Sequence, residues 1–137
     1  MLAKQKVKYG EFMMFNSDKE THLPLYLKYI PDRPLQNVFI RLASLMTPFW
    51  NSIPYKSIRK FAKTVNMEYS RLSGRIKTLE RLGVIAITDE YLYINPYIVT
   101  KSRDIEFSTI KYFLSETGEY DEEGEPKCIF TILMKDK

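Results

Sequence analysis

The sequence predicts an α+β protein in which three helices precede a two-stranded β-hairpin, with β extensions at both ends. Its 137 residues suit one domain with appendages. Apolar residues recur at helical spacing in three successive segments between positions 32 and 82, and the spacing changes to that of strands after Gly83. We therefore expect an N-terminal extended arm over 1–31, a central domain over 32–103 and a C-terminal extension over 104–137.

The two extensions differ in composition. Val7–Phe15 is rich in aromatic residues and suits one or two short strands around Gly10. In the C-terminal extension, Ser115–Pro126 holds six carboxylates and no basic residue, which indicates an exposed acidic loop, whereas Lys127–Met134 has the composition of a strand. Edge pairing of the arm and this strand would join two copies of the chain.

The first helix is expected to begin at Asp32 as N-cap, with Pro34 near its first position, and to end at Pro48. Phe49 and Trp50, just beyond it, are expected to fill the core. The apolar stripe of this helix consists of Leu35, Val38, Phe39, Leu42, Leu45 and Met46.

The second helix is expected to start at Ser57, a good N-cap residue. A tight turn at Asn66–Met67 then leads into a third helix from about Glu68 to Leu82, which Gly83 closes as a left-handed cap. The apolar stripe of the second helix is Ile58, Phe61, Ala62 and Val65.

The third helix is expected to have a buried face and an open face. Leu72, Ile76 and Leu79 fall within a narrow arc when successive residues are rotated by about 100°. The opposite arc holds Ser70, Gly74, Lys77 and Arg81, with Arg71 on one flank and Tyr69 and Ser73 on the other.

Extended segments follow this helix. Val84–Ile87 and Tyr91–Ile94 are predicted to form a hairpin joined by Thr88–Glu90. Asn95-Pro96 interrupts it, and Tyr97–Val99 is expected to be extended again. Three helices followed by a hairpin wing, with a short turn between the second and third helices, are typical of a winged helix-turn-helix.

Charge is distributed unevenly along the chain. Residues 1–103 carry 17 Lys and Arg against 8 Asp and Glu, whereas residues 104–137 carry 4 against 9. Tyr55–Leu82 alone has eight basic and two acidic residues, a net +6. An excess of this size indicates a surface that meets a polyanion, although a solvated helical face is the simpler alternative.

A helix-turn-helix reads DNA with the N-terminal part of its third helix in the major groove. The expected base-proximal residues are Tyr69, Ser70, Arg71, Ser73 and Gly74, with Arg71 as guanine donor. Gly74 is either tolerated or required for close approach of DNA. The expected phosphate contacts are Lys56, Ser57, Lys60, Lys63, Arg75, Lys77 and Arg81.

The hairpin tip departs from this picture. Thr88-Asp89-Glu90 would repel phosphate, so we expect the hairpin to stay off the DNA backbone. Lys101 and Arg103 are candidates to compensate for this charge, but a purely structural hairpin is the more economical interpretation.

Other classes of function have little support. His22 and Cys128 are the single residues of their kinds, so we expect no metal site and no internal disulfide. No nucleotide-binding glycine motif or catalytic constellation occurs, which argues against an enzyme and against a cofactor. Without a membrane-length apolar stretch or a secretion signal, we expect a cytoplasmic protein with no membrane partner.

The helix-turn-helix and the strand after it resemble the RepL-type plasmid replication and maintenance proteins, which have phage relatives. The marks are Asn95-Pro96 directly after Tyr91–Ile94, and Gly10-Glu11-Phe12 before the helices. The resemblance covers roughly residues 10–114 and implies a plasmid or phage protein that acts in replication. The family usually has a glycine a few residues after the Asn-Pro and a basic wing tip, where this chain has Lys101-Ser102 and an acidic tip.

We expect a sequence-specific double-stranded DNA-binding protein, acting in replication initiation or transcriptional regulation as a homodimer. A protein of the replication or transcription machinery is a further expected partner. The alternative is a winged-helix adaptor that binds a basic protein and no DNA. An RNA-binding protein would need exposed stacking aromatics, for which Tyr91, Tyr93 and Tyr97 are the candidates.

Overall fold

The computed structural model describes residues 12–102, 119–120, 122 and 126–127. Over these residues the protein is mixed α+β, with four helices and three small antiparallel sheets. The helices are α1 (Leu25–Tyr29), α2 (Arg33–Ala43), α3 (Tyr55–Thr64) and α4 (Tyr69–Arg81). The strands are β1 (Met14–Phe15), β2 (Ser52–Pro54), β3 (Ile85–Ile87), β4 (Tyr91–Ile94), β5 (Val99–Thr100), β6 (Glu119–Tyr120) and β7 (Pro126–Lys127).

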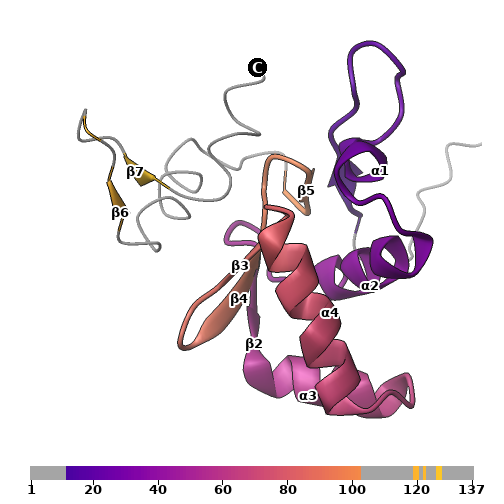
Figure 1. Ribbon diagram of the computed structural model, residues 1–137, viewed down its shortest axis with the longest axis vertical. Helices are drawn as coiled ribbons and strands as arrows, with labels where there is room; N and C mark the ends of the chain where they lie inside the picture. The colour runs from indigo at the N-terminus through magenta and orange to yellow at the C-terminus, as the bar shows by residue number, and fades with distance from the viewer. Residues whose placement is uncertain (1–11, 103–118, 121, 123–125, 128–137) are drawn as a thin grey trace, which may run out of the picture.

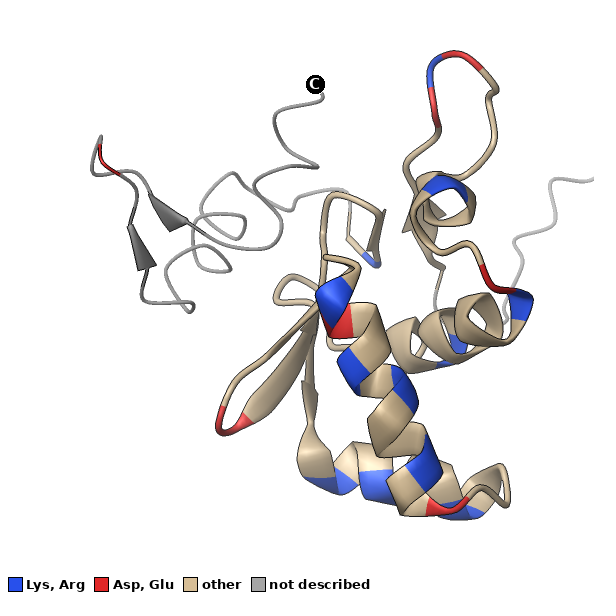
Figure 2. Cartoon of the chain, in the orientation of Figure 1, with Lys and Arg blue, Asp and Glu red and all other residues tan. Residues whose placement is uncertain are grey.

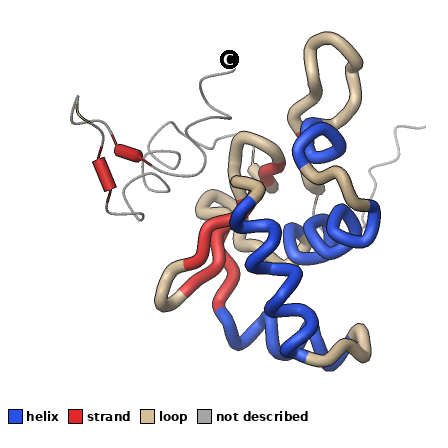
Figure 3. The backbone as a smooth tube through the Cα atoms, viewed as in Figure 1, coloured by secondary structure: helices blue, strands red, loops and turns tan. Residues whose placement is uncertain are grey.

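Three helices and one sheet form the centre of the molecule (Figure 1). Helix α4 contacts α2, α3 and β3, and α3 contacts β2. The sheet has the order β2-β4-β3, while β1 pairs with β5 and β6 with β7. Figure 3 shows the three-stranded sheet on one side of α4 and α2 on the other.

One apolar core joins these elements. Phe39 of α2, Leu72 and Leu79 of α4 and Leu92 of β4 are fully buried, and Ile76 is nearly so. The predicted inner stripe of the third helix is thus confirmed. Each such side chain contributes roughly 1.5–3 kcal/mol through removal of apolar surface from water.

Helix α2 is shorter than predicted. Asp32 occupies the N-cap position without a side-chain capping hydrogen bond, and the helix ends at Ala43 instead of at Pro48. Leu45 and Met46 follow in tighter turns, in which their N–H groups donate to the carbonyls three residues earlier at 2.9 and 3.2 Å. The chain tightens here because it must reverse toward β2 within a few residues.

The prediction that Phe49 and Trp50 fill the core is wrong, since they are 55% and 56% exposed. The chain reverses through left-handed conformations at Phe49 (φ 74°) and Asn51 (φ 52°). As a result Asn51 and Ile53, both fully buried, enter the interior in place of the two rings.

Helix α3 begins two residues before the predicted start. Its N-cap is Pro54, in an extended conformation, and no side chain caps it. Ser57 lies inside the first turn, so its assignment as N-cap is wrong. The reason is strand β2, which the sequence analysis missed: Ser52 pairs with Tyr93 and Pro54 with Tyr91, and the helix starts where this pairing ends.

The turns on either side of α4 agree with the sequence predictions. Asn66 has φ 52°, and Met67 N–H donates to the Ala62 carbonyl at 2.9 Å. Gly83 has φ 82°, and Val84 N–H donates to the Leu79 carbonyl at 3.3 Å. In both turns, left-handed residues satisfy the carbonyls at a helix end.

Beyond the hairpin, a buried asparagine organises the chain. Asn95 is 1% exposed; its side chain donates to the Gly83 carbonyl at 3.0 Å and accepts from Tyr97 N–H at 2.9 Å. Residues 96–98 therefore form a turn, and only Val99 and Thr100 are extended, as β5. The expected extended run from Tyr97 is wrong because Asn95 folds the backbone around its own amide.

The described part of the N-terminal segment packs against the central domain. It contains β1, which pairs with β5, and the helix α1, which an extended arm does not predict. Leu25 and Ile30 are buried. Strand β1 falls within Val7–Phe15, where short strands are expected. The part of that segment around Gly10 and most of the C-terminal extension lie outside the described residues.

In the part of the chain that the structure describes, no helix combines the length and the apolar character needed to cross a membrane.

Candidate nucleic-acid interface

The outward face of α4 is open among the described residues. Ser70, Gly74, Lys77 and Arg81 are all exposed, on the side opposite the buried stripe. Figure 2 shows basic positions along the length of this helix. The predicted division of the third helix into a buried face and an open face is thus confirmed.

Gly74 has free space around it. A methyl group added at its Cα would meet no atom within 4 Å. Packing within the described protein therefore does not require glycine, although glycine in a helix is less favourable than alanine by about 1 kcal/mol. Both interpretations remain: a tolerated residue, or one that an external partner approaches closely.

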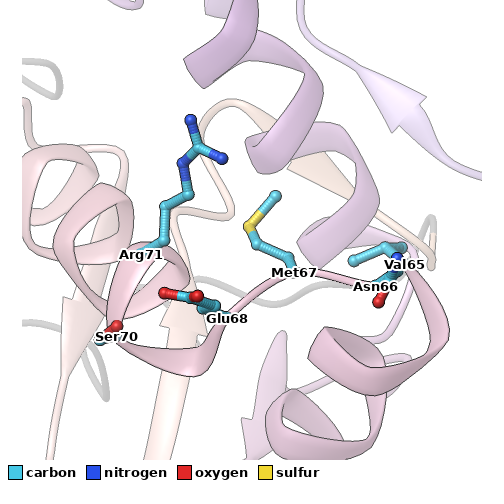
Figure 4. A pocket seen from close by; sticks show the side chains of 6 residues that line it. All are labelled: Val65, Asn66, Met67, Glu68, Ser70 and Arg71. Carbon is cyan, nitrogen blue, oxygen red and sulfur yellow. The ribbon is translucent and has the colours of Figure 1, made fainter.

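Arg71 and Arg75 lie on one flank of the open face. Arg71 is exposed, and Arg75 is half-buried. A pocket at the turn between α3 and α4 is lined by Val65, Asn66, Met67, Glu68, Ser70 and Arg71 (Figure 4). The figure shows Arg71 extending away from the Glu68 carboxylate, so the guanidinium is available to an external group.

Tyr69 and Ser73 lie on the other flank, toward α3. The guanidinium carbon of Arg59 lies 5.4 Å from the centroid of the Tyr69 ring, which is a cation–π arrangement. Tyr69 is 42% exposed. No role for Arg59 is predicted from the sequence, because only the folded chain brings the first turn of α4 against the second turn of α3.

The surface of α3 carries the remaining cations. Lys56, Arg59, Lys60 and Lys63 are exposed and, with Tyr55, line one shallow pocket. Ser57 is half-buried in the first turn, where its backbone N–H is still among those without a helical partner. Of the predicted phosphate-contacting residues of α3, Lys56, Lys60 and Lys63 are therefore together on one surface, and Ser57 is not among the residues that line it.

The basic residues of α3 and α4 are not neutralised by their neighbours. Within residues 12–102, no carboxylate lies within 4 Å of any of their side-chain nitrogens. Arg81 donates to the Thr78 hydroxyl at 3.2 Å, which leaves its charge uncompensated. We call this set of eight residues the basic surface: Lys56, Arg59, Lys60, Lys63, Arg71, Arg75, Lys77 and Arg81.

The hairpin tip has the opposite charge and is tied to α3. Asp89 and Glu90 are exposed, and the Tyr55 hydroxyl donates to the Thr88 carbonyl. Burial raises the pKa of the Tyr55 phenol, and repulsion from nearby Tyr69, Glu80 and Asp89 raises it further. The phenol is therefore protonated at neutral pH and keeps its donor.

Lys101 does not compensate for the acidic tip. Its ammonium group donates to the Ser44 carbonyl at 2.6 Å and to the Met46 carbonyl at 2.9 Å, and so satisfies the end of α2. Arg103 lies outside the described residues. The structure thus gives Lys101 a structural role.

Among the described residues, no three His, Cys, Asp or Glu side chains lie close enough together to hold a metal ion. His22 is exposed in the loop before α1, with φ 62°.

Comparison of the chain with known protein families, with curated proteins and with solved structures finds no match.

Proposed function

We propose that α2, α3, α4 and the β3–β4 hairpin form a winged helix-turn-helix. The order of elements supports this, as do the left-handed turn at Asn66 between α3 and α4 and the packing of α4 on both α2 and α3. In such an arrangement the inner helices brace the last helix, and its far side is left to a partner.

We propose that the protein binds double-stranded DNA by placing α4 in the major groove. The observation that carries this proposal is the basic surface, whose eight cations have no carboxylate partner among the described residues. A groove about 12 Å wide admits one helix, and the sugar-phosphate backbones on either side supply the anions that the flanking cations need.

The roles proposed for individual residues are based on their positions on α3 and α4. Ser70, Arg71 and Gly74 lie where base edges would come closest, and Ser73 is at the flank. Lys56, Lys60 and Lys63, together with Ser57 in the first turn of α3, suit one phosphate backbone. Arg75, Lys77 and Arg81 complete the set of phosphate contacts.

The biological setting is proposed on the resemblance to RepL-type proteins: a plasmid or phage protein in replication initiation or transcriptional regulation. A homodimer belongs to the same proposal, because two-fold symmetry lets a small domain read two half-sites. The N-terminal arm was expected to help join the two copies by edge pairing. In the structure, however, β1 of this arm already pairs with β5 of its own chain. The strand expected at Lys127–Met134 is described only at Lys127.

A titration of the protein against duplex DNA at several salt concentrations tests the proposal. Neutralising Z phosphates releases counterions, so the logarithm of the affinity should fall linearly with the logarithm of the salt concentration, with a slope of about −0.9Z. A slope near zero, or no binding at low salt, would overturn it. Selection of bound fragments from a random duplex pool then identifies the preferred site.

The exposed acidic tip favours a second candidate function, an adaptor that binds a basic protein through Asp89 and Glu90. A pull-down from nuclease-treated host lysate distinguishes the two, because only an adaptor retains its partner once DNA has been removed. Loss of all partners on nuclease treatment supports DNA binding.

A further inference from the structure

Arg59 is oriented within the protein by a contact with α4. It lies on the exposed side of α3, and its guanidinium lies over the ring of Tyr69, the first residue of α4. Among the described residues it has no acidic partner. An exposed cation–π contact shifts a conformational equilibrium by roughly two- to five-fold, enough to favour one arrangement of a flexible side chain.

We propose that Tyr69 is a positioning residue, which orients the Arg59 guanidinium for contact with a DNA phosphate beside the groove that α4 enters. The inference rests on the proposed function and changes the role predicted for Tyr69, from base contact to support of a neighbouring cation. Arg59 belongs to α3 and shares a shallow pocket with Lys56, Lys60 and Lys63, so its contact is with the backbone and is independent of base sequence.

The physical reason is preorganisation. A free arginine loses rotamer freedom when it binds, whereas a guanidinium already held over a ring loses less. The planar group can stack and still direct its N–H donors outward to phosphate oxygens. Lysine, with a compact ammonium group, does not offer the same stacked plane.

A double-mutant cycle measured by fluorescence anisotropy tests this, with a labelled mixed-sequence duplex at several NaCl concentrations. Arg59→Ala should weaken binding by roughly eight-fold near 0.1 M salt and reduce the steepness of the salt dependence by about 1, as expected for one lost phosphate contact. Tyr69→Ala should weaken binding by roughly two- to five-fold. The double variant should bind no worse than Arg59→Ala alone, because Tyr69 acts through Arg59.

Two controls separate this from general effects. Tyr69→Phe keeps the ring and should bind like the wild type, whereas a role for the hydroxyl would make it as weak as Tyr69→Ala. Arg41→Ala removes an equal charge from the exposed surface of α2 and should change binding much less than Arg59→Ala. Thermal unfolding of each variant shows whether it is folded.

Multiplying effects of Arg59→Ala and Tyr69→Ala would overturn the inference, as would a Tyr69→Phe variant as weak as Tyr69→Ala. Either result leaves DNA binding itself intact. Failure of the wild-type protein to bind the duplex at low salt would instead overturn the proposed function, and it appears before any variant is measured.

Discussion

The outward face of α4 and the turn around Asn95 both contain polar side chains, but in opposite surroundings. Asn95 is buried, and both its amide nitrogen and its oxygen form hydrogen bonds with the backbone. Lys77 and Arg71 are exposed and make no ion pair with the described residues. A buried polar group must be satisfied inside the protein, whereas unpaired surface cations interact with water and mobile anions.

This difference separates two kinds of residue. Substitutions around Asn95 should change the free energy of unfolding and leave the DNA affinity of the folded protein unchanged. Substitutions on the basic surface should change the DNA affinity and leave the free energy of unfolding unchanged.

Asn95→Ala should destabilise the protein by about 3 kcal/mol, because it removes two hydrogen bonds, one to the carbonyl of buried Gly83 and one from the N–H of half-buried Tyr97. Chemical denaturation monitored by circular dichroism measures the change. An effect below the size of one ordinary hydrogen bond would show that Asn95 does not organise this turn.

Arg71→Ala should reduce discrimination between the preferred duplex and a single-base variant by about 2 kcal/mol, since a bidentate contact to guanine distinguishes bases on that scale. Competition binding with the two duplexes measures it. Unchanged stability is the matched expectation, because Arg71 is exposed and makes no ion pair with the described residues. Equal loss of affinity for both duplexes would place Arg71 on the backbone instead.

Lys60→Ala should weaken binding to all duplexes alike, by about 1 kcal/mol near 0.1 M salt, because one released counterion is worth that much. The salt dependence should become less steep by about 1. Lys28→Ala, at an exposed position of α1, is the matched control and should have little effect. A sequence-dependent loss at Lys60 would contradict the assignment to phosphate.

Gly74→Ala should stabilise the protein by roughly 0.5–1 kcal/mol, since the new methyl group meets no atom within 4 Å and alanine favours the helix. Its effect on DNA distinguishes the two interpretations of this glycine. Weaker binding by a more stable protein indicates close approach of DNA at this position. Unchanged binding indicates that Gly74 is merely tolerated.

Neutralising the hairpin tip with Asp89→Asn and Glu90→Gln should have the smallest effect, a gain in DNA affinity of a few tenths of a kcal/mol. Both carboxylates are exposed, so water and salt screen their repulsion of the phosphates. Anisotropy titrations at low and moderate salt measure it. A gain of ten-fold or more would show that the tip lies against the backbone, contrary to our expectation.

The parts that the sequence predicted well depend on local periodicity. The stripe of Leu72, Ile76 and Leu79, the left-handed Gly83 and the β3–β4 hairpin all follow from residues close together in the chain. The start of α3 was placed incorrectly because it depends on β2, and β2 exists only through its pairing with β4, some forty residues away. Phe49 and Trp50 were misplaced because hydrophobicity does not indicate that a left-handed turn directs them outward.

The candidate site shows the same division. Net charge, and the arc that carries Ser70, Gly74, Lys77 and Arg81, can be counted from the sequence. The roles of Lys101 and Arg59 cannot, because the carbonyls near the end of α2 and the ring of Tyr69 reach them only in the folded protein.

Amino-acid order alone determined which face of each helix is apolar and where positive charge accumulates, since both depend on a repeat of 3.6 residues. Tertiary structure decided which polar groups form hydrogen bonds or cation–π contacts within the protein and which stay exposed to solvent. Hydrogen bonds and cation–π contacts act over a few ångströms, and folding alone brings residues that are distant in the chain within that range.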